Sequence, residues 1–363
     1  MTGGGIYPAI AVLQALENNI EKILWIGSDS GMEKKLLRDY NLTLEVIPAA
    51  GLHGVNLLSI PANLIKLIKG WLVSRKILAE FKPDVIFYTG GYVGVPVAYA
   101  NRKKIPSVVF IPDIEPGTAL KQILPDASII TVCNNASLEN SKFRNKTHVT
   151  GYPVRKNLLK WNRATGRKYF GIPPKGTVIF VFGGSKGSRS INQAILTHLE
   201  LLIHDFYIIH ISGENNWDEI KTFYDQLTPE TKQRYFVYPF LQDEMGAALA
   251  AADLAICRAG ASTLGELPAF SLPAILVPYP HAWRYQIQNA EYLEKNGAAI
   301  ILFDNLLQTK LLKTIQEIMT DDNRLTMMKA NMRKLSKPLA AKSISRLLVE
   351  AGNPAKQEER KNG

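Results

Sequence analysis

Short apolar runs alternate with longer amphipathic stretches along most of the 363 residues. In the first half, the runs that predict strands are 22–27, 42–48, 84–88, 107–111, 128–133 and 147–151, and the stretches that predict helices are 9–16, 32–40, 61–81 and 95–102. In the second half, the predicted strands are 178–182, 206–212, 236–239, 253–257 and 273–277. Strands that alternate with helices form parallel sheets covered on both faces. The pattern therefore predicts an α/β protein with doubly wound, Rossmann-like sheets.

The length of the chain is sufficient for two domains, each with its own core. A polar stretch that contains glycine and proline, residues 156–175, separates the two alternating halves. We expect an amino-terminal domain at 1–157 and a carboxy-terminal domain at 158–335. A helix at 336–355 and a disordered tail at 356–363 complete the predicted organisation.

Four turns rich in glycine or other small residues lie beside predicted strands or helices, at residues 3–5, 90–91, 183–187 and 259–261. At such a turn, the free N–H groups and the positive end of the helix dipole point at one spot. Each turn is therefore a candidate site for phosphate groups.

Polar side chains near the last of these turns are candidates for binding a nucleotide sugar. Glu266 lies one turn into a helix expected to begin at Ser262 or Thr263, where its carboxylate can accept bonds from two ribose hydroxyls. The spacing Thr263-x-x-Glu266 also fits a capping box, in which Glu266 only satisfies its own helix start. Gln286 and Asn289 are three residues apart, share a helix face and are candidates for binding sugar hydroxyls.

The net charge of +11 calls for an anionic partner, and a phosphorylated substrate or an anionic lipid fits best. Nucleic acid is the weakest candidate, because the basic residues are spread over both halves without an Arg-rich arm. Cys133 and Cys257 lie in apolar runs with no CxxC pattern, which argues for a reducing compartment and against zinc. No apolar run approaches the ~20 residues that span a bilayer.

The predicted helix 61–81 combines apolar side chains with interleaved cations. Leu64, Ile68 and Trp71 represent its apolar positions, and Lys69 its basic ones. A basic amphipathic helix of this kind binds anionic membrane surfaces. The alternative is a core helix with a solvated basic edge.

The segment from 258 to 290 also resembles a known family. It contains RAGASTLGEL, LPAILVPYP and the pattern His281-x-x-Arg284-x-Gln286-x-x-Asn289, which together resemble the donor-sugar signature of the MurG glycosyltransferases. The resemblance implies two Rossmann-like domains that face a cleft (the GT-B architecture). It also implies inverting transfer of N-acetylglucosamine from UDP-N-acetylglucosamine to the undecaprenyl-pyrophosphoryl-muramyl-pentapeptide, at the cytoplasmic face of the membrane.

Further segments match this family and assign donor-binding roles. The matches are Met-Thr-Gly-Gly-Gly at the start, GGYV at 90–93, GYPVR at 151–155, GGSKGS at 183–188 and FLQDEM at 240–245. The donor-binding residues that the resemblance implies are Gly3, Gly4, Arg155, Ser185, Lys186, Met245, Ala261, Ser262, Thr263, Glu266, Gln286 and Asn289. Because the sequence has no Asp-x-Asp motif, we expect helix N-termini, Arg155 and Lys186 to stabilise the leaving diphosphate, with neither a metal nor a cofactor.

The chain departs from the family on the acceptor side. Gly5 replaces the histidine proposed as the catalytic base, and the strand expected before the first glycine loop is missing, so we expect a truncated or misassigned start. Asp113 and Glu115 are candidates for the base, or are loop carboxylates without a chemical role. These departures leave open a transferase with a different lipid-linked acceptor, and a catalytically impaired UDP-sugar-binding protein.

Overall fold

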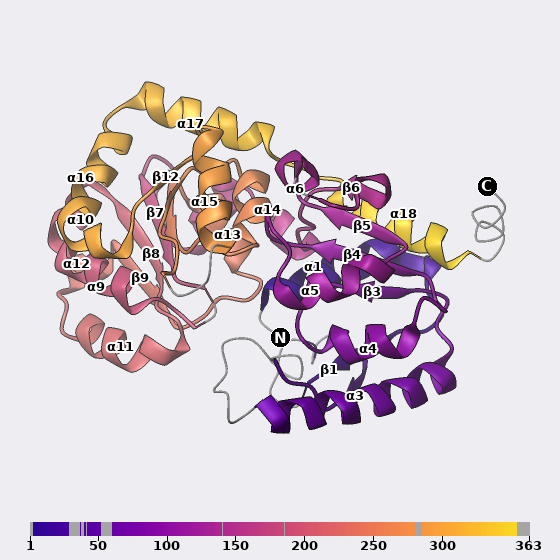
Figure 1. The fold of residues 1–363 in the computed structure, drawn as a ribbon. Helices are drawn as coiled ribbons and strands as arrows, with labels where there is room; N and C mark the ends of the chain where they lie inside the picture. Colours follow the sequence, from indigo (N-terminus) through magenta and orange to yellow (C-terminus); the bar gives the residue numbers. More distant parts are fainter. Residues whose placement is uncertain are drawn as a thin grey trace. The chain divides into compact units, whose positions relative to one another are not determined.

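The structure is a computed structural model, and it describes residues 3–28, 37, 40, 42–51, 60–139, 141–184, 186–280 and 285–353. The chain forms two compact units, Met1–Pro153 with Pro338–Gly363, and Val154–Lys337. Both are layered α/β structures with parallel strands, which confirms the predicted fold class (Figure 1). In the described part of the chain, no helix has both the length and the apolar character needed to cross a membrane.

The second unit has one continuous sheet. Its six strands are β7 (Val178–Phe182), β8 (Tyr207–Ile211), β9 (Tyr235–Tyr238), β10 (Leu254–Cys257), β11 (Ala274–Leu276) and β12 (Ala299–Ile301). They are parallel and lie in the order β12-β11-β10-β7-β8-β9. The chain thus starts at the centre, winds to one edge and then returns to wind to the other. The topological switch point lies between β7 and β10, where such sheets bind ligands beyond the strand ends.

Amphipathic helices cover this sheet because their apolar positions recur every three or four residues. One face carries α9 (Arg189–Thr197), α10 (Leu199–Asp205), α16 (Leu307–Met319) and α17 (Asp322–Lys334), whose buried side chains join those of the strands in one core. On the opposite face, α13 (Met245–Ala251) packs against β7 and against α8 (Arg163–Tyr169). The remaining helical segments are α7 (Lys156–Leu159), η6 (Glu214–Asn216), α11 (Trp217–Asp225), α12 (Pro229–Lys232), α14 (Thr263–Ala269), α15 (Tyr285–Lys295) and η7 (Asp304–Leu306).

Asp253, directly before β10, ties these layers together. Its buried carboxylate lies 2.7 Å from Arg163, 2.8 Å from Arg167 and 3.2 Å from Lys329, and it accepts the Val178 N–H at 3.0 Å. Burial raises the pKa of this carboxyl, but the bonds and charges around it outweigh burial and hold the pKa below its usual range. The cluster joins α8, β7 and α17 around one charge.

Among the residues that the structure describes, the first unit has two sheets. β1 (Leu24–Gly27) pairs with β2 (Thr43–Val46), and β3 (Ile86–Tyr88), β4 (Ser107–Ile111), β5 (Ile129–Val132) and β6 (Thr147–Val149) form a separate sheet in that order. The helical segments are α1 (Gly3–Leu16), η1 (Glu17–Asn19), α3 (Ile60–Phe81), α4 (Gly94–Asn101), α5 (Thr118–Ile123), η4 (Leu124–Asp126), α6 (Asn135–Glu139), η5 (Arg144–Lys146) and α18 (Ala340–Gly352).

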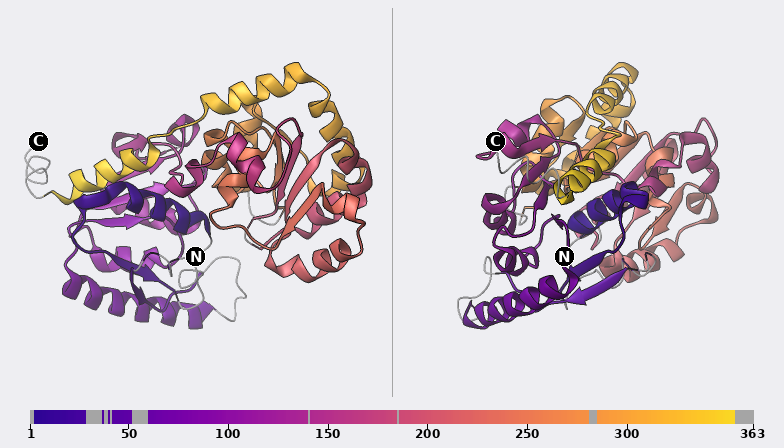
Figure 2. Two further views of the ribbon diagram at one scale, coloured as in Figure 1. Left: turned by 180° about the vertical axis from the view of Figure 1, so that it is seen from behind. Right: turned by 90° about the vertical axis from the view of Figure 1, so that its right-hand side faces the viewer.

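Helices cover both sides of the first unit. α3, α4 and α5 contribute to a core with one face of β3, β4 and β5. On the other side, α18 packs against α1, β4 and β5. Figure 2 shows α18 and α1 side by side. The sequence predicts a separate helix at 336–355. In the structure this helix is α18, and it belongs to the first unit.

The structure corrects the predicted start of the first helix. Residues 3–5 were expected in a loop before a helix at 9–16, but α1 already begins at Gly3 and contains Pro8. Ile6 and Ile10, one turn apart, are buried with Leu37, so the apolar face of the helix extends upstream of the proline. The predicted helix 32–40 lies outside the described residues except for Leu37 and Tyr40.

Candidate functional site

The carboxyl ends of β7 and β10 lie side by side at the switch point of the second unit. Gly184, after β7, has φ +87°, a backbone conformation that favours glycine. A Cβ added at Gly184 or at Gly260, after β10, would meet no heavy atom within 4 Å. The same atom at Gly187 would lie 2.0 Å from the Ser212 carbonyl oxygen. Glycine therefore permits close packing at Gly187, whereas Gly184 and Gly260 border open space.

The turn after β10 is fixed by its own polar groups. α14 begins at Thr263, as the sequence predicted, and the Thr263 hydroxyl and N–H donate to the Gly260 carbonyl at 2.6 and 3.0 Å. Asn289 is fully buried, and its Nδ2 donates to the Ala259 carbonyl at 3.1 Å. Ala261 is buried and Ser262 is half-buried. The backbone of this turn is therefore held in place from both sides.

Glu266 lies in a buried position with charged and polar neighbours. Burial raises the pKa of its carboxyl, although the charge of Arg155 and a hydrogen bond from Ser262 oppose the rise. The capping box with Thr263 is not formed, because Thr263 is the first residue of α14 and the helix has no side-chain cap bond. The Glu266 charge also helps to raise the pKa of the Cys257 thiol, mainly raised by burial. Glu266 is thus a buried acidic group beside a cation.

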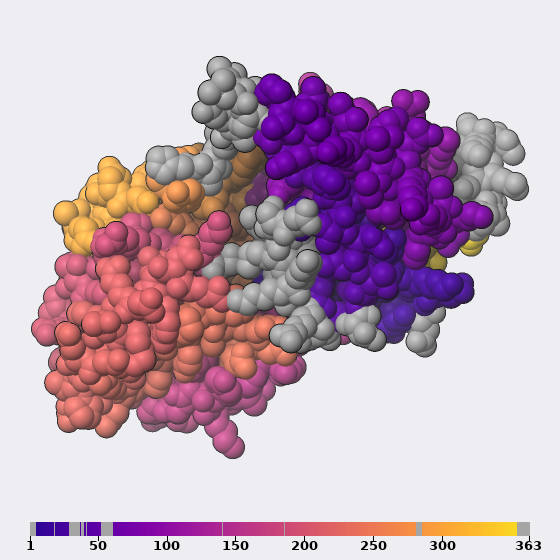
Figure 3. Space-filling model, turned by 90° about the horizontal axis from the view of Figure 1, so that it is seen from below, coloured from indigo at the N-terminus to yellow at the C-terminus, as the bar shows by residue number. Residues whose placement is uncertain are grey.

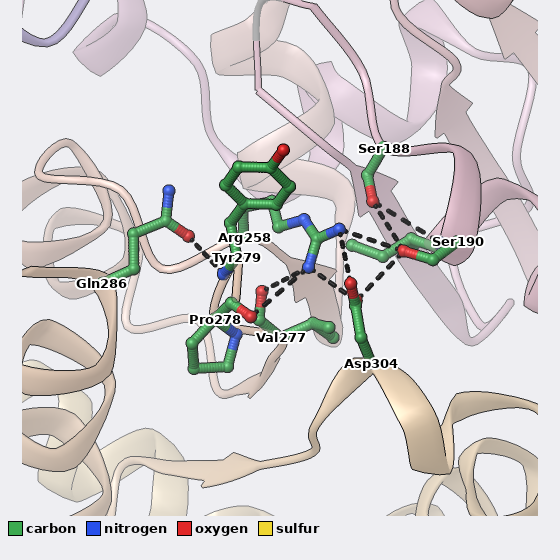
Figure 4. Close-up of polar contacts among 9 residues, drawn as sticks. Ser188, Ser190, Arg258, Val277, Pro278, Tyr279, Gln286 and Asp304 are labelled. Carbon is green, nitrogen blue, oxygen red and sulfur yellow. Dashed lines mark hydrogen bonds and ion pairs between the residues drawn. The ribbon is translucent and has the colours of Figure 1, made fainter. Parts of the chain in front are cut away.

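Arg258 connects the ends of several strands (Figure 4). Its Nη1 lies 2.7 Å from Asp304 Oδ1 and donates to the Val277 carbonyl at 3.1 Å. Its Nη2 donates to Ser190 Oγ at 3.0 Å, and Ser190 Oγ donates to Asp304 Oδ1 at 3.0 Å. The guanidinium lies 5.2 Å from the centre of the Tyr279 ring, within cation–π range. The guanidinium of Arg258, which follows β10, thereby contacts Val277 after β11, Asp304 after β12 and Ser190 at the start of α9.

Tyr279 links this cluster to α15. Its N–H donates to Gln286 Oε1 at 2.9 Å, as Figure 4 shows. Gln286 and Asn289 both lie on α15, which confirms that they share a helix. The two side chains differ in burial. Gln286 is half-buried, whereas Asn289 is fully buried beneath the turn that follows β10. His281 and Arg284 of the same motif lie outside the described residues.

The other predicted donor-site residues come from three further segments of the second unit. Lys186 is exposed in the turn after β7, and its carbonyl accepts from Asn216 at 3.4 Å; Ser185 lies outside the described residues. Arg155 is buried at the start of α7, and Met245 is the half-buried first residue of α13. The charge of Arg155 opposes the rise in the pKa of Glu266, so the two side chains interact electrostatically.

In the first unit, the glycine turn and the two candidates for the catalytic base follow β3 and β4. Gly90 and Gly91 have φ +116° and +81° after β3, and a Cβ on Gly90 would meet no heavy atom within 4 Å. Gly90 therefore serves the turn rather than close packing. Asp113 and Glu115 are half-buried after β4, and the charge of Asp113 adds to burial in raising the pKa of the Cys133 thiol. Gly3, Gly4 and Gly5 lie in the first turn of α1.

The outer surface of α3 carries apolar side chains, and it lies on the side of the molecule that Figure 3 presents. Leu64, Ile65, Ile68 and Leu72 are each at least 50% exposed. Lys69 is exposed beside them, and Trp71 is half-buried with the Arg75 guanidinium 5.1 Å from its ring centre. α3 also contributes the buried Ile77 to the core of the first unit, so this helix combines a core contact with an exposed apolar stripe.

The sequence patterns predict neither the bridging role of Arg258 nor that of Asp304. Asp304 is 46 residues from Arg258 and belongs to no recognised motif. The available signal was the position of Arg258 directly after a buried strand, where charged side chains of α/β proteins gather at the ligand-binding edge.

Within the described ranges, no group of three or more His, Cys, Asp or Glu side chains has a metal-binding arrangement.

Comparison with known proteins identifies the family. The glycosyltransferase family 28 N-terminal domain matches residues 2–110, and the family 28 C-terminal domain matches residues 178–344. A UDP-N-acetylglucosamine--N-acetylmuramyl-(pentapeptide) pyrophosphoryl-undecaprenol N-acetylglucosamine transferase of Halothermothrix orenii is 36% identical over 361 residues, covering 96% of each chain. The protein of that name from Roseiflexus sp. is 34% identical and covers 96% of this chain and 92% of its own.

A solved structure agrees with these relatives. The crystal structure of MurG from Acinetobacter baumannii superposes with a TM-score of 0.72 at 26% identity, covering 95% of this chain and 96% of that one. The resemblance seen in the RAGASTLGEL segment is therefore confirmed over nearly the whole chain. Two domain models that together match more than half of the residues, and relatives above 30% identity, show that the chain belongs to glycosyltransferase family 28.

Proposed function

We propose that this chain transfers N-acetylglucosamine from UDP-N-acetylglucosamine to an undecaprenyl-pyrophosphoryl-muramyl-pentapeptide acceptor, with inversion at the anomeric carbon. The observation that carries the proposal is the open space beside Gly184 and Gly260 at the switch point of the second unit. Glu266, in α14 after the turn that follows β10, interacts electrostatically with Arg155. Relatives that match along their whole length carry this activity in their names.

The donor nucleotide is expected to lie across the ends of β7 and β10. Glu266 accepts bonds from the ribose hydroxyls, and Met245 lies beside the uracil. Arg155, Ser185, Lys186 and the turn 261–263 surround the diphosphate, where fixed positive groups stabilise the charge that develops on the leaving group. Gln286 binds the sugar hydroxyls, and Asn289 acts through the Ala259 carbonyl that it holds.

The acceptor hydroxyl attacks the anomeric carbon on the side opposite the diphosphate, and a base removes its proton. With Gly5 in place of the family histidine, Asp113 is the first candidate for the base and Glu115 the second. Gly3 and Gly4 contribute backbone groups to donor binding, and the turn at Gly90 and Gly91 is a further anion-binding turn of the first unit. The bond from carbon to the UDP oxygen breaks as the new glycosidic bond forms.

Turnover of UDP-N-acetylglucosamine with the lipid-linked muramyl-pentapeptide tests the proposal. We expect UDP release that depends on the acceptor and persists in EDTA. Calorimetric UDP binding without turnover on this acceptor would favour a transferase with another lipid-linked acceptor, or an impaired binding homologue. UDP binding that requires magnesium or manganese would contradict the proposed electrostatic role of the side chains.

We further propose that α3 docks this enzyme peripherally on an anionic membrane surface at the cytoplasmic face. The exposed stripe of Leu64, Ile68 and their neighbours supplies the apolar contact, and Lys69 supplies charge. Ile68→Glu should reduce co-sedimentation with phosphatidylglycerol vesicles. Leu201→Glu is the matched control, because Leu201 is 60% exposed but lies in α10 of the second unit. An equal loss in both variants would contradict docking through α3.

A further inference from the structure

A buried histidine lies behind the glycine turn of the second unit. His210, in β8, contacts the Tyr235 hydroxyl through Nδ1 at 2.7 Å and Asn192 Oδ1 through Nε2 at 3.0 Å. Asn192 donates from Nδ2 to the Ser212 carbonyl at 2.9 Å. All four residues are at most 1% exposed. A continuous chain of three hydrogen bonds therefore runs through the core from β9 to the residue that follows β8.

One member of this chain fixes the direction of all the bonds. The Ser212 carbonyl can only accept, so Asn192 must present Nδ2 to it and Oδ1 to the imidazole ring. His210 must then carry its proton on Nε2 and accept at Nδ1 from the Tyr235 hydroxyl. The opposite tautomer would place a ring lone pair against an amide oxygen. The geometry thus permits one arrangement of protons, in which every donor points toward Ser212.

Burial keeps both titratable groups in the forms that this arrangement needs. It lowers the pKa of His210 to about 3, so the ring is neutral near neutral pH. It also raises the pKa of Tyr235, so the hydroxyl retains the proton that it donates. The chain of bonds therefore does not change its protonation near neutral pH.

The last residue of the chain packs on the glycine turn that follows β7. A Cβ added to Gly187 would lie 2.0 Å from the Ser212 carbonyl oxygen, and one added to Gly213 would lie 2.3 Å from the Gly187 Cα. The Asn216 side chain donates to the Ser212 carbonyl at 3.3 Å and to the Lys186 carbonyl at 3.4 Å. The two backbone segments are therefore in such close contact that a shift of the Ser212 carbonyl must move the turn.

We propose that His210 is a positioning residue for the donor diphosphate, acting through Asn192 and Ser212 on the turn after β7. The inference rests on the proposed binding of UDP-N-acetylglucosamine at that turn. By fixing the Asn192 amide, His210 holds the Ser212 carbonyl, and a turn that is held in advance binds the diphosphate without rearrangement. The uridine part of the donor is assigned to Glu266 and Met245, so His210 should affect only ligands that carry phosphate.

Two amide substitutions separate the roles of the two ring nitrogens. His210→Gln places a donor near the position of Nε2, so it can still bond Asn192, but it leaves the Tyr235 hydroxyl unpaired. His210→Asn reaches only the position of Nδ1, so it can accept from Tyr235 but leaves the Asn192 amide free to reverse. Each variant loses one buried hydrogen bond and should lose a similar amount of stability. Only His210→Asn removes the bond that orients the turn.

Affinities for UDP and for uridine, measured on the whole chain, test the inference. We expect His210→Asn to weaken UDP binding by about tenfold or more with uridine binding unchanged, and His210→Gln to keep UDP binding within about threefold. Partial unfolding would weaken both ligands equally, so the ratio of the two affinities separates positioning from stability. An unchanged ratio in His210→Asn, or an equal change of the ratio in both variants, would overturn the inference.

Hydrogen exchange without any ligand gives a second readout. The Gly187 N–H donates to the Gly184 carbonyl at 2.9 Å, and its exchange should accelerate in His210→Asn but not in His210→Gln. Amides of β11 report the overall stability of the unit and should respond equally to the two variants. Equal exchange at Gly187 in both variants would contradict the inference. If the unaltered protein binds no UDP, the proposed activity fails, whereas exchange at Gly187 still decides whether His210 holds the turn.

Discussion

The two units are both parallel α/β structures, but their described strands are joined into sheets differently. In the second unit, the first strand, β7, lies at the centre of a continuous sheet whose core strands are fully buried. In the described part of the first unit, β1 and β2 form one sheet and β3 to β6 another, and a cavity borders β1 and β3, whose residues are mostly half-buried. The comparison teaches that the same alternation of apolar runs can give one continuous parallel sheet or two separate ones.

The units also differ in how their strand ends are held. In the second unit, Arg258, Asp304 and Asn289 fix the turns through side-chain bonds. In the first unit, the turn at Gly90 and Gly91 relies on positive φ angles, and Asp113 lies in a short loop after β4. We therefore expect donor binding and structural stability to depend on the second unit, and the chemical step to depend on the first.

The largest expected effect separates the chemical step from binding. Asp113→Asn should lower kcat by roughly 10²–10⁴-fold, the usual contribution of a general base, while UDP affinity measured by calorimetry stays unchanged. Asp126→Asn is the control, because Asp126 forms an exposed pair with Lys103 at 3.2 Å in the same unit. Retained turnover in Asp113→Asn together with lost turnover in Glu115→Gln would transfer the role to Glu115.

Removing the charge that joins the strand ends should destabilise the second unit. Arg258→Met removes the guanidinium from the Val277 carbonyl and leaves the Asp304 carboxylate with the Ser190 hydroxyl but without its cation. The free energy of unfolding should fall by about 2–4 kcal/mol. Denaturant titration measures the loss. Arg189→Met is matched to it, because Arg189 forms only an exposed pair with Glu219 and should cost less than about 1 kcal/mol. Similar losses in both variants would show that the cluster is not a structural centre.

Glu266→Ala should weaken UDP binding by roughly 1–3 kcal/mol, because hydrogen bonds to a charged acceptor are lost. Calorimetry gives the affinity, and thermal unfolding of the same variant gives its stability. Glu266→Gln keeps the shape of the side chain without its charge. Its affinity for UDP should lie between that of Glu266→Ala and that of the unaltered protein. Reduced stability with unchanged UDP affinity would assign Glu266 a purely structural role.

The smallest expected effect is the pH dependence of UDP binding. Burial raises the pKa of Glu266, so the carboxylate takes up its proton at a higher pH than an ordinary glutamate does. If the ionised form accepts the ribose hydroxyls, UDP affinity should decrease as the pH falls through this raised pKa. Glu266→Gln should remove that part of the pH profile. A profile identical in the two proteins would contradict the assignment.

Much of the fold could be predicted because five of the six strands of the second unit are apolar runs bounded by polar or glycine residues. The exception is β12, a three-residue strand that the pattern does not predict. The turn and helix start at Thr263 could be predicted for the same local reason. The start of α1 could not, because burial of Ile6 and Ile10 extended the helix across Pro8 and into the glycines. The contact between Arg258 and Asp304 was also beyond the sequence, since the fold alone brings these distant positions together.

The position of α18 has a consequence for how the chain is made. This helix comes from the end of the sequence but packs on α1, β4 and β5, so the second unit is inserted within the first. During synthesis, the inserted unit can fold as soon as residue 337 has left the ribosome, whereas the unit begun earliest must wait for residue 352. The amino-terminal half of this protein is therefore the last part to be completed.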